Sequence, residues 1–124
     1  MYGEARVNRP TRFNTRYYSD KQEKAVAKSL GGKQTANSGA TKFNAGDVIL
    51  SDSNFLIECK TCIEEKKSFA IKHDWLTKNK EEAFAMGKSY SALCFNYGDN
   101  RENYYIIDEM LFKQLLEYIT NENS

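Results

Sequence analysis

The chain has 124 residues, of which 40% are hydrophobic and 13% aromatic, enough for one compact domain with a core. No apolar run approaches the roughly 20 residues that a membrane-spanning helix needs. The first ten residues lack the apolar core of a signal peptide. Three cysteines, an odd number, argue against a disulfide framework. We therefore expect a protein of the cytoplasm or nucleoid with no membrane partner.

The net charge of +1 hides an uneven distribution along the chain. Residues 1–46 contain nine Lys and Arg against three Asp and Glu, whereas residues 47–124 contain nine against fourteen. A basic end indicates an anionic partner, and the alternative is a solvated basic tail. The pI of about 7.6 is below that of most DNA-coating proteins. We expect a localised contact with nucleic acid.

Residues 1–18 show no clear periodicity, so we predict a flexible basic arm before a single domain over residues 19–124. Aromatic residues are interleaved with arginines in this arm, a mixture that can stack on bases and pair with phosphates. The arginines expected to contact nucleic acid are Arg6, Arg9, Arg12 and Arg16.

A helix is expected over residues 19–30, because Ser19 and Gln22 form a capping-box pattern and two glycines follow Leu30. Glu23 lies in the first turns of this helix and shares a side with its buried face. After a loop-like stretch, the hydrophobic pattern predicts strands at 47–51 and 55–61, a helix at 74–86, strands at 91–97 and 104–107, and a terminal helix at 108–119.

This order of elements predicts an α/β fold (α+β mixed sheet) in which one central mixed sheet is flanked by helices. In the terminal helix, the apolar residues expected to point inward are Met110, Leu111, Leu115 and Ile119.

The two central strands carry the most informative residues. The Ser-Asp-Ser-Asn sequence between them is typical of a turn, and a turn centred on Asp52 and Ser53 places Asp47 opposite Glu58. Opposed Cβ atoms in an antiparallel pair lie roughly 4.5–5.5 Å apart, so two carboxylates there repel unless a cation lies between them. Lys60 falls on the same face as Glu58, because side chains alternate along a strand.

This combination suits metal-dependent cleavage of phosphodiester bonds. One or two carboxylates can hold Mg²⁺, which activates water and neutralises charge on the phosphate. Asp47 and Glu58 are the candidate ligands, and the main-chain carbonyl of Cys59 is a further one. Lys60 can orient the water or stabilise the charge of the transition state.

The sequence GD47 followed by E58-C59-K60 resembles the D…E-x-K motif of the PD-(D/E)xK nuclease superfamily, with Gly46 in place of the proline that often precedes the aspartate. The helix glutamate Glu23 and the serine of N37-S38-G39-A40 extend the resemblance to archaeal Hjc-type and phage-encoded Holliday junction resolvases. It covers about residues 19–107.

This resemblance implies a restriction-endonuclease-like core and an Mg²⁺-dependent endodeoxyribonuclease, with Mn²⁺ as an alternative ion. The substrate would be four-way or otherwise branched DNA in recombination and repair, and a homodimer would make the paired cuts. A phage origin is plausible on the same ground. The residues that it assigns to catalysis or metal binding are Glu23, Ser38, Asp47, Glu58 and Lys60.

Three lysines outside the motif are candidates for phosphate contacts, namely Lys33, Lys42 and Lys88, and for each a solvated lysine is the alternative. Two other functions remain open. One is a nuclease of the same fold that acts on flaps, nicks or foreign DNA, and the other is a non-catalytic nucleic-acid-binding module. No small-molecule substrate is expected.

The CxxC spacing of Cys59 and Cys62 does not predict a zinc site, because residues of a strand three apart point to opposite faces and few other ligands exist. G31-G32-K33-Q34 lacks the residues of a phosphate-binding Walker loop. His73 is expected to be a cap or a surface residue.

Overall fold

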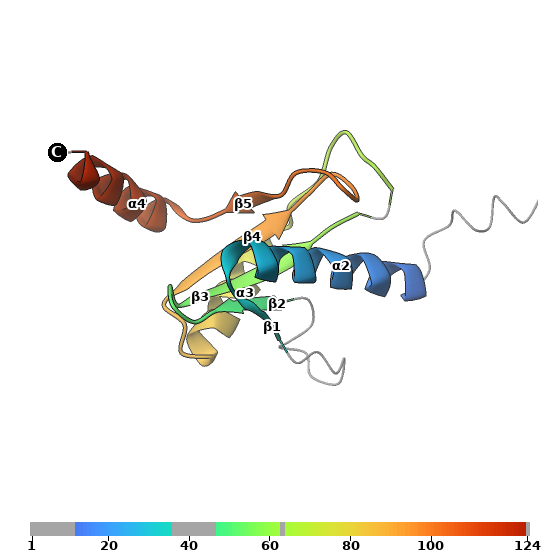
Figure 1. Cartoon of the computed structure of the whole chain (residues 1–124), viewed down its shortest axis with the longest axis horizontal. Helices are drawn as coiled ribbons and strands as arrows, with labels where there is room; N and C mark the ends of the chain where they lie inside the picture. The colour runs from blue at the N-terminus through green and yellow to red at the C-terminus, as the bar shows by residue number, and fades with distance from the viewer. Residues whose placement is uncertain (1–11, 36–46, 63, 124) are drawn as a thin grey trace, which may run out of the picture.

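The computed structural model describes residues 12–35, 47–62 and 64–123. Five strands form one mixed sheet in the order β1-β2-β3-β4-β5 (Figure 1). The strands are β1 (Lys33–Gln34), β2 (Asp47–Leu50), β3 (Phe55–Lys60), β4 (Tyr90–Phe95) and β5 (Tyr104–Ile106). Only the β3–β4 pair is parallel within this sheet. The α/β fold with a mixed sheet is therefore confirmed.

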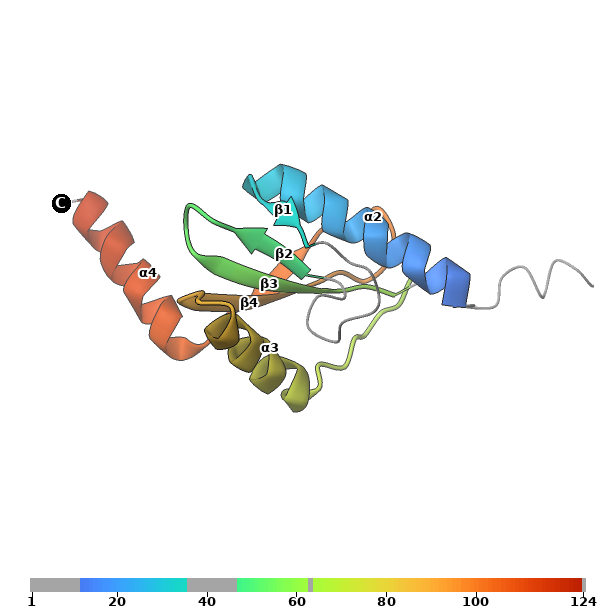
Figure 2. The same ribbon diagram turned by 90° about the horizontal axis from the view of Figure 1, so that it is seen from below.

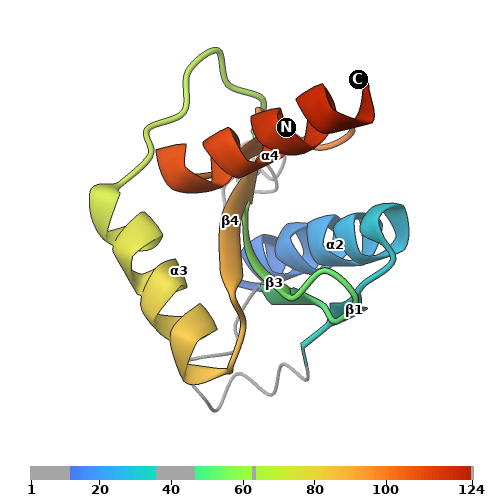
Figure 3. The ribbon, with the colours of Figure 1, turned by 90° about the vertical axis from the view of Figure 1, so that its left-hand side faces the viewer.

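Within the described residues three helices accompany the sheet, namely α2 (Arg12–Leu30), α3 (His73–Ala85) and α4 (Glu109–Glu122). α2 and α3 cover opposite faces, with β3 and β4 between them (Figures 2 and 3). α3 connects the two parallel strands, which need a long crossover connection. No helix in the described ranges is both long and apolar enough to span a membrane.

One cluster of core residues lies between α2 and the sheet, while the fully buried Leu56 and Leu93 lie outside it. Val26 of α2 is fully buried against alternate residues of the central strands, which point to this face. The buried members of this cluster are Val26, Val48, Ile57, Cys59, Ala92 and Cys94. The other face of β2 and β3 carries Asp47, Glu58 and Lys60, so the candidate site lies on the side of α3.

α2 begins at Arg12, seven residues before the start that the sequence predicts. Residues 12–18 are therefore helical, and the prediction that they belong to a flexible arm is wrong. The capping box is also wrong, because Ser19 lies inside the helix and Gln22 is buried, where its Nε2 donates to the carbonyl of Lys60 at 2.8 Å. No glycine or proline interrupts the helix from Arg12 onward.

α4 extends away from the sheet at one end of the molecule (Figure 1). Asp108 caps it by accepting from the N–H of Leu111 at 2.9 Å and pairs with Lys80 of α3 at 2.7 Å. Leu111 is buried as predicted. The prediction that Met110, Leu115 and Ile119 also point inward is wrong, because all three are exposed. Beyond its first turn, α4 does not pack against the sheet or the other helices that the structure describes.

Gly32 lets the chain pass close to β2 as it leaves α2. A Cβ at this position would clash with the Leu50 side chain and lie 2.6 Å from the carbonyl oxygen of Ile49. Gly32→Ala should lower the free energy of unfolding by about 1–3 kcal/mol through overpacking. Urea denaturation measures this loss, and Ser29→Ala at the exposed end of α2 is the control. Equal stability of both variants would contradict the close approach.

Candidate metal centre

The hairpin of β2 and β3 has the register that the sequence predicts. Asp47 pairs with Glu58, and Leu50 pairs with Phe55. The turn between the strands is closed by Asn54 in the left-handed region, with φ of 64°, a conformation that asparagine tolerates. The pairing places two carboxylates side by side on the face of the sheet that α3 covers.

Asp47 is the most constrained of these acids. Its side chain is buried, with 1% of the residue exposed, and neither carboxylate oxygen receives a hydrogen bond from an N–H or hydroxyl donor in the described part of the chain. The nearby carboxyl of Glu82 can offer it a hydrogen bond only if the two share a proton. A buried carboxylate without donors is costly, because it loses hydration and gains nothing in return.

Glu82 of α3 is the site residue that the sequence analysis missed. One carboxylate oxygen each from Asp47, Glu58 and Glu82 lie within 4.8 Å of one another. Glu82 follows Trp75 by seven residues, two helical turns, so both project from the same side of α3. The spacing from Trp75 was the sequence signal that could have pointed to Glu82. The sequence alone, however, does not say which side of this helix lies against β2 and β3.

Two of the three acids, Asp47 and Glu82, have raised pKa values. Burial first, and then the charge of Glu58, raise the pKa of Asp47 to about 8; Glu82 and Glu23 act in the same direction. Burial and the charge of Glu58 also raise the pKa of Glu82. Without a bound cation, Asp47 therefore holds a proton at neutral pH, and a cation that binds there displaces it.

Lys60 lies beside the acids as the same-face spacing predicts. Its Nζ is 3.0 Å from Oε2 of Glu58 and 4.5 Å from the ring centroid of Trp75 on α3. The ion pair and the cation–π contact fix the ammonium group at the edge of the cluster. Its main-chain carbonyl is already engaged by Gln22. The lysine charge offsets only part of the negative charge at the site.

Glu23 lies on α2, on the other face of the sheet. It is buried, with 1% of the residue exposed, and accepts a hydrogen bond from Nε2 of Gln34 at 2.7 Å. Glu23 is not a member of the group whose oxygens lie within 4.8 Å. Its charge still contributes to the raised pKa of Asp47, so it lies within electrostatic range of the site.

The cysteines pack in the core and take no part in the cluster. Cys59 pairs with Cys94 across β3 and β4, and both are buried with Cys62 as free thiols. Among the described residues, the group able to hold a metal contains carboxylates only. The main-chain carbonyl of Cys59, between Glu58 and Lys60 in β3, remains a predicted ligand.

Several predicted DNA contacts and one catalytic residue, namely Arg6, Arg9, Ser38 and Lys42, lie outside the described residues. Arg12 and Arg16 lie in the first turns of α2. Lys33 is exposed on β1. The role of each remains a prediction.

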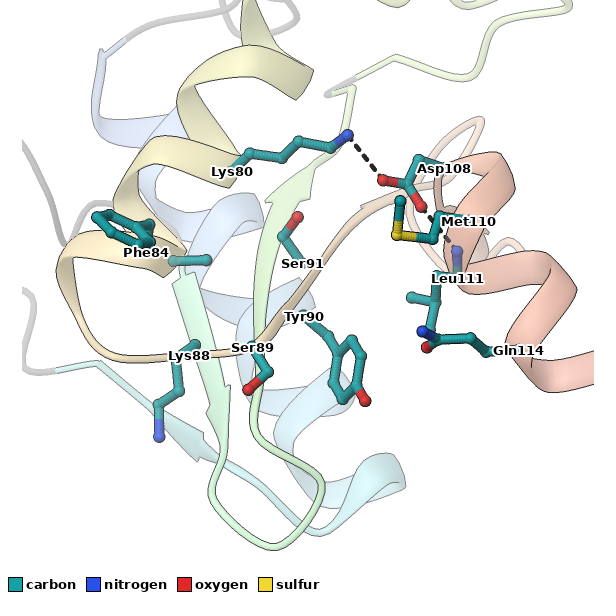
Figure 4. A pocket seen from close by; sticks show the side chains of 11 residues that line it. Lys80, Phe84, Lys88, Ser89, Tyr90, Ser91, Asp108, Met110, Leu111 and Gln114 are labelled. Atoms are coloured by element: carbon teal, nitrogen blue, oxygen red, sulfur yellow. Dashed lines mark hydrogen bonds and ion pairs between the residues drawn. The ribbon is translucent and has the colours of Figure 1, made fainter. Parts of the chain in front are cut away.

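Lys88 lies between α3 and β4, and its main-chain N–H donates to the carbonyl of Ala83, the residue after Glu82, at 2.8 Å. Figure 4 shows its side chain beside those of Phe84 and Ser89 at a pocket of about 360 Å³ between α3, β4 and α4.

Comparisons of the chain with models of protein families, with curated proteins and with solved structures find no match.

The cluster has the chemistry of a site for a hard divalent cation. Mg²⁺ and Mn²⁺ prefer oxygen ligands, and the oxygens of Asp47 have no donors within the described residues to satisfy them. A cation between Asp47 and Glu58 would replace their repulsion by attraction. The residues present therefore fit the metal that the sequence predicts.

The raised pKa of Asp47 predicts how stability depends on pH. The folded protein holds a proton on Asp47 up to about pH 8, whereas the unfolded chain releases it near 3.8. Without metal, stability should therefore fall as pH rises from 4 to 8, by at most about 1.4 kcal/mol per pH unit for this group.

Melting temperatures in EDTA between pH 5 and pH 9 test this dependence. Asp47→Asn should flatten it, since the amide does not titrate, whereas Asp52→Asn in the exposed turn of the same hairpin should leave it unchanged. The same slope in the parent and in Asp47→Asn would contradict the assignment.

Proposed function

We propose that this protein is an Mg²⁺-dependent endodeoxyribonuclease with a restriction-endonuclease-like core, acting on branched DNA and chiefly on four-way junctions. The observation that carries the proposal is the pairing of Asp47 with Glu58. Asp47 is buried at the start of β2, and Lys60 lies beside Glu58 on the same face of the sheet. A purely structural hairpin gains nothing from two facing acids of which one has no hydrogen-bond donor among the residues that the structure describes.

Each residue of the site has a role in this reaction. Asp47 and Glu58 hold the cation, together with the carbonyl of Cys59. A bound Mg²⁺, or Mn²⁺ in its place, supplies an activated water and neutralises charge on the phosphate. Lys60 orients the attacking water and stabilises charge on the phosphoryl oxygens, since its ammonium group lies 3.0 Å from Glu58.

Two residues assigned by the resemblance complete the proposal. Ser38 would contact the scissile phosphate or the water. Glu23 would act through water, because its carboxylate is engaged by Gln34 on the far side of the sheet.

The topology supports the proposed core. A helix precedes a β-hairpin, and a helical crossover then leads to a parallel strand, as α2, β2, β3, α3 and β4 follow one another. The order of these elements is the one that the hydrophobic pattern predicts, and the hairpin brings the motif residues of both its strands to one face.

DNA would be held through its phosphates, which supply affinity but little sequence information. Lys33 and the arginines of the N-terminal region are the proposed contacts, with Lys42 and Lys88. The small chain offers little surface for reading sequence, so recognition of DNA structure is the favoured mode.

Paired cuts in a junction need two active sites, and we propose a homodimer. The apolar residues that α4 exposes are the surface proposed for a second copy. Among them Leu116 is 46% and Ile119 is 53% exposed. A two-fold axis would place the same face of each α4 against its counterpart, and burial of these side chains would stabilise the pair.

Cleavage of an end-labelled four-way junction tests the nuclease. The parent should make paired nicks with Mg²⁺ and none with EDTA, while Glu58→Gln should abolish cleavage and Lys60→Met should slow it by at least ~100-fold, the typical effect of losing one charge-stabilising group. Glu64→Gln, an exposed acid after β3, is the control.

The other outcomes select between the alternatives. Equal cleavage of linear or flapped duplex would favour a broader nuclease, and DNA binding without metal-dependent cleavage would favour a non-catalytic module and contradict the proposal.

Light scattering during size-exclusion chromatography tests the homodimer. The parent should elute as a dimer at micromolar concentrations, and Leu116→Glu should convert it to a monomer because a charge is costly in an apolar interface. Asn121→Glu adds the same charge to the same helix outside the apolar face and should remain dimeric. A monomeric parent would contradict the proposal.

A further inference from the structure

We infer that Glu82 of α3 is a third ligand of the cation proposed between Asp47 and Glu58, so that the site uses three carboxylates and binds one divalent ion. This inference rests on the metal site of the proposed function but is independent of whether the protein cleaves DNA. It assigns the third carboxylate to the helix that follows the strands, not to Glu23 on the helix that precedes them.

The geometry brings Glu82 to the ion site. Its carboxylate lies within the group of oxygens that are 4.8 Å or less apart, and a single ion at their centre can contact all three. Asp47, buried to 1% exposure, provides an independent sign of a ligand, since both its oxygens lack a hydrogen-bond donor in the described part of the chain.

α3 holds Glu82 in place. Asn79, one turn earlier, is buried and donates from Nδ2 to the carbonyl of Ala92 in β4 at 2.9 Å. Ala83, the next residue, is buried with 3% exposure. The helix is therefore fixed against the sheet on both sides of Glu82, and a ligand on such a rigid element is well positioned before the ion binds.

An ordinary surface glutamate would be expected to have a cationic partner or to face solvent. Glu82 is half-buried, and within the described residues no ion pair involves it. A half-buried acid held among other acids is a position that a bound cation stabilises.

The charges favour a single ion. Three carboxylates and the ammonium group of Lys60 leave a net charge of about −2 when all are ionised, which one divalent cation neutralises. A second divalent ion would leave an excess of positive charge in a half-buried site, at an additional desolvation cost.

The test is binding of Mn²⁺ to the DNA-free protein at pH 8, measured by isothermal titration calorimetry. The parent should bind one ion, and Glu82→Gln should weaken the affinity at least ~10-fold, since even residues that only support a ligand contribute 10–100-fold. Glu81→Gln removes the same charge from the exposed neighbouring position and should bind like the parent.

Thermal melting separates a ligand from a structural residue. Without metal, Glu82→Gln should melt at a higher temperature than the parent, because one repelling charge is gone. Saturating Mn²⁺ should then raise the melting temperature of Glu82→Gln by less than it raises that of the parent. If the variant does not fold, carbon-detected NMR of the parent replaces it, and the Glu82 carboxyl resonance should shift on addition of Mg²⁺ while that of Glu81 does not.

The outcomes distinguish this inference from the proposed function. Equal Mn²⁺ affinity in the parent and Glu82→Gln, or an unshifted Glu82 resonance in a parent that binds metal, would overturn the role of Glu82 and leave the nuclease intact. Two ions per parent chain would overturn the single-ion site. A parent that binds no Mn²⁺ would overturn both.

Discussion

The repulsion between Asp47 and Glu58 is the constraint on which the rest of the site depends. The hairpin register holds the two acids opposite each other, and burial removes the water that would screen them. Asp47 responds with a pKa near 8, so that it keeps a proton at neutral pH until a cation replaces it. Lys60 offsets part of the charge, and Glu82 adds to it. The fold therefore keeps Asp47 protonated, and a bound cation would favour its ionised form.

The centre of this arrangement could be predicted from the sequence because it depends on local rules. A short polar turn between two apolar runs sets the register of a hairpin, and the alternation of side chains then decides which residues share a face. Those two rules place Asp47 opposite Glu58 and Lys60 beside it, as the structure has them. The α/β class follows from the order of helices and strands.

What could not be predicted depends on contacts between distant segments. The side of α3 that faces the sheet is set by Asn79, which donates to Ala92 of β4, and by the burial of Ala83. This orientation brings Glu82 to the acids. The capping pattern at Ser19 fails because α2 extends back to Arg12, which places Ser19 inside the helix. Gln22 does not serve as a cap but donates to the main-chain carbonyl of Lys60. The exposure of α4 follows from the direction in which the chain leaves β5. The amphipathic pattern of the helix does not reveal this direction.

The measurement that tests the central claim most directly is the location of a bound ion in crystals soaked in Mn²⁺, by anomalous scattering. The account predicts one anomalous peak among the carboxylates of Asp47, Glu58 and Glu82, with oxygens within roughly 2.5 Å of the ion. Saturating Mn²⁺ with no peak at these acids, or a peak only at other residues, would contradict it.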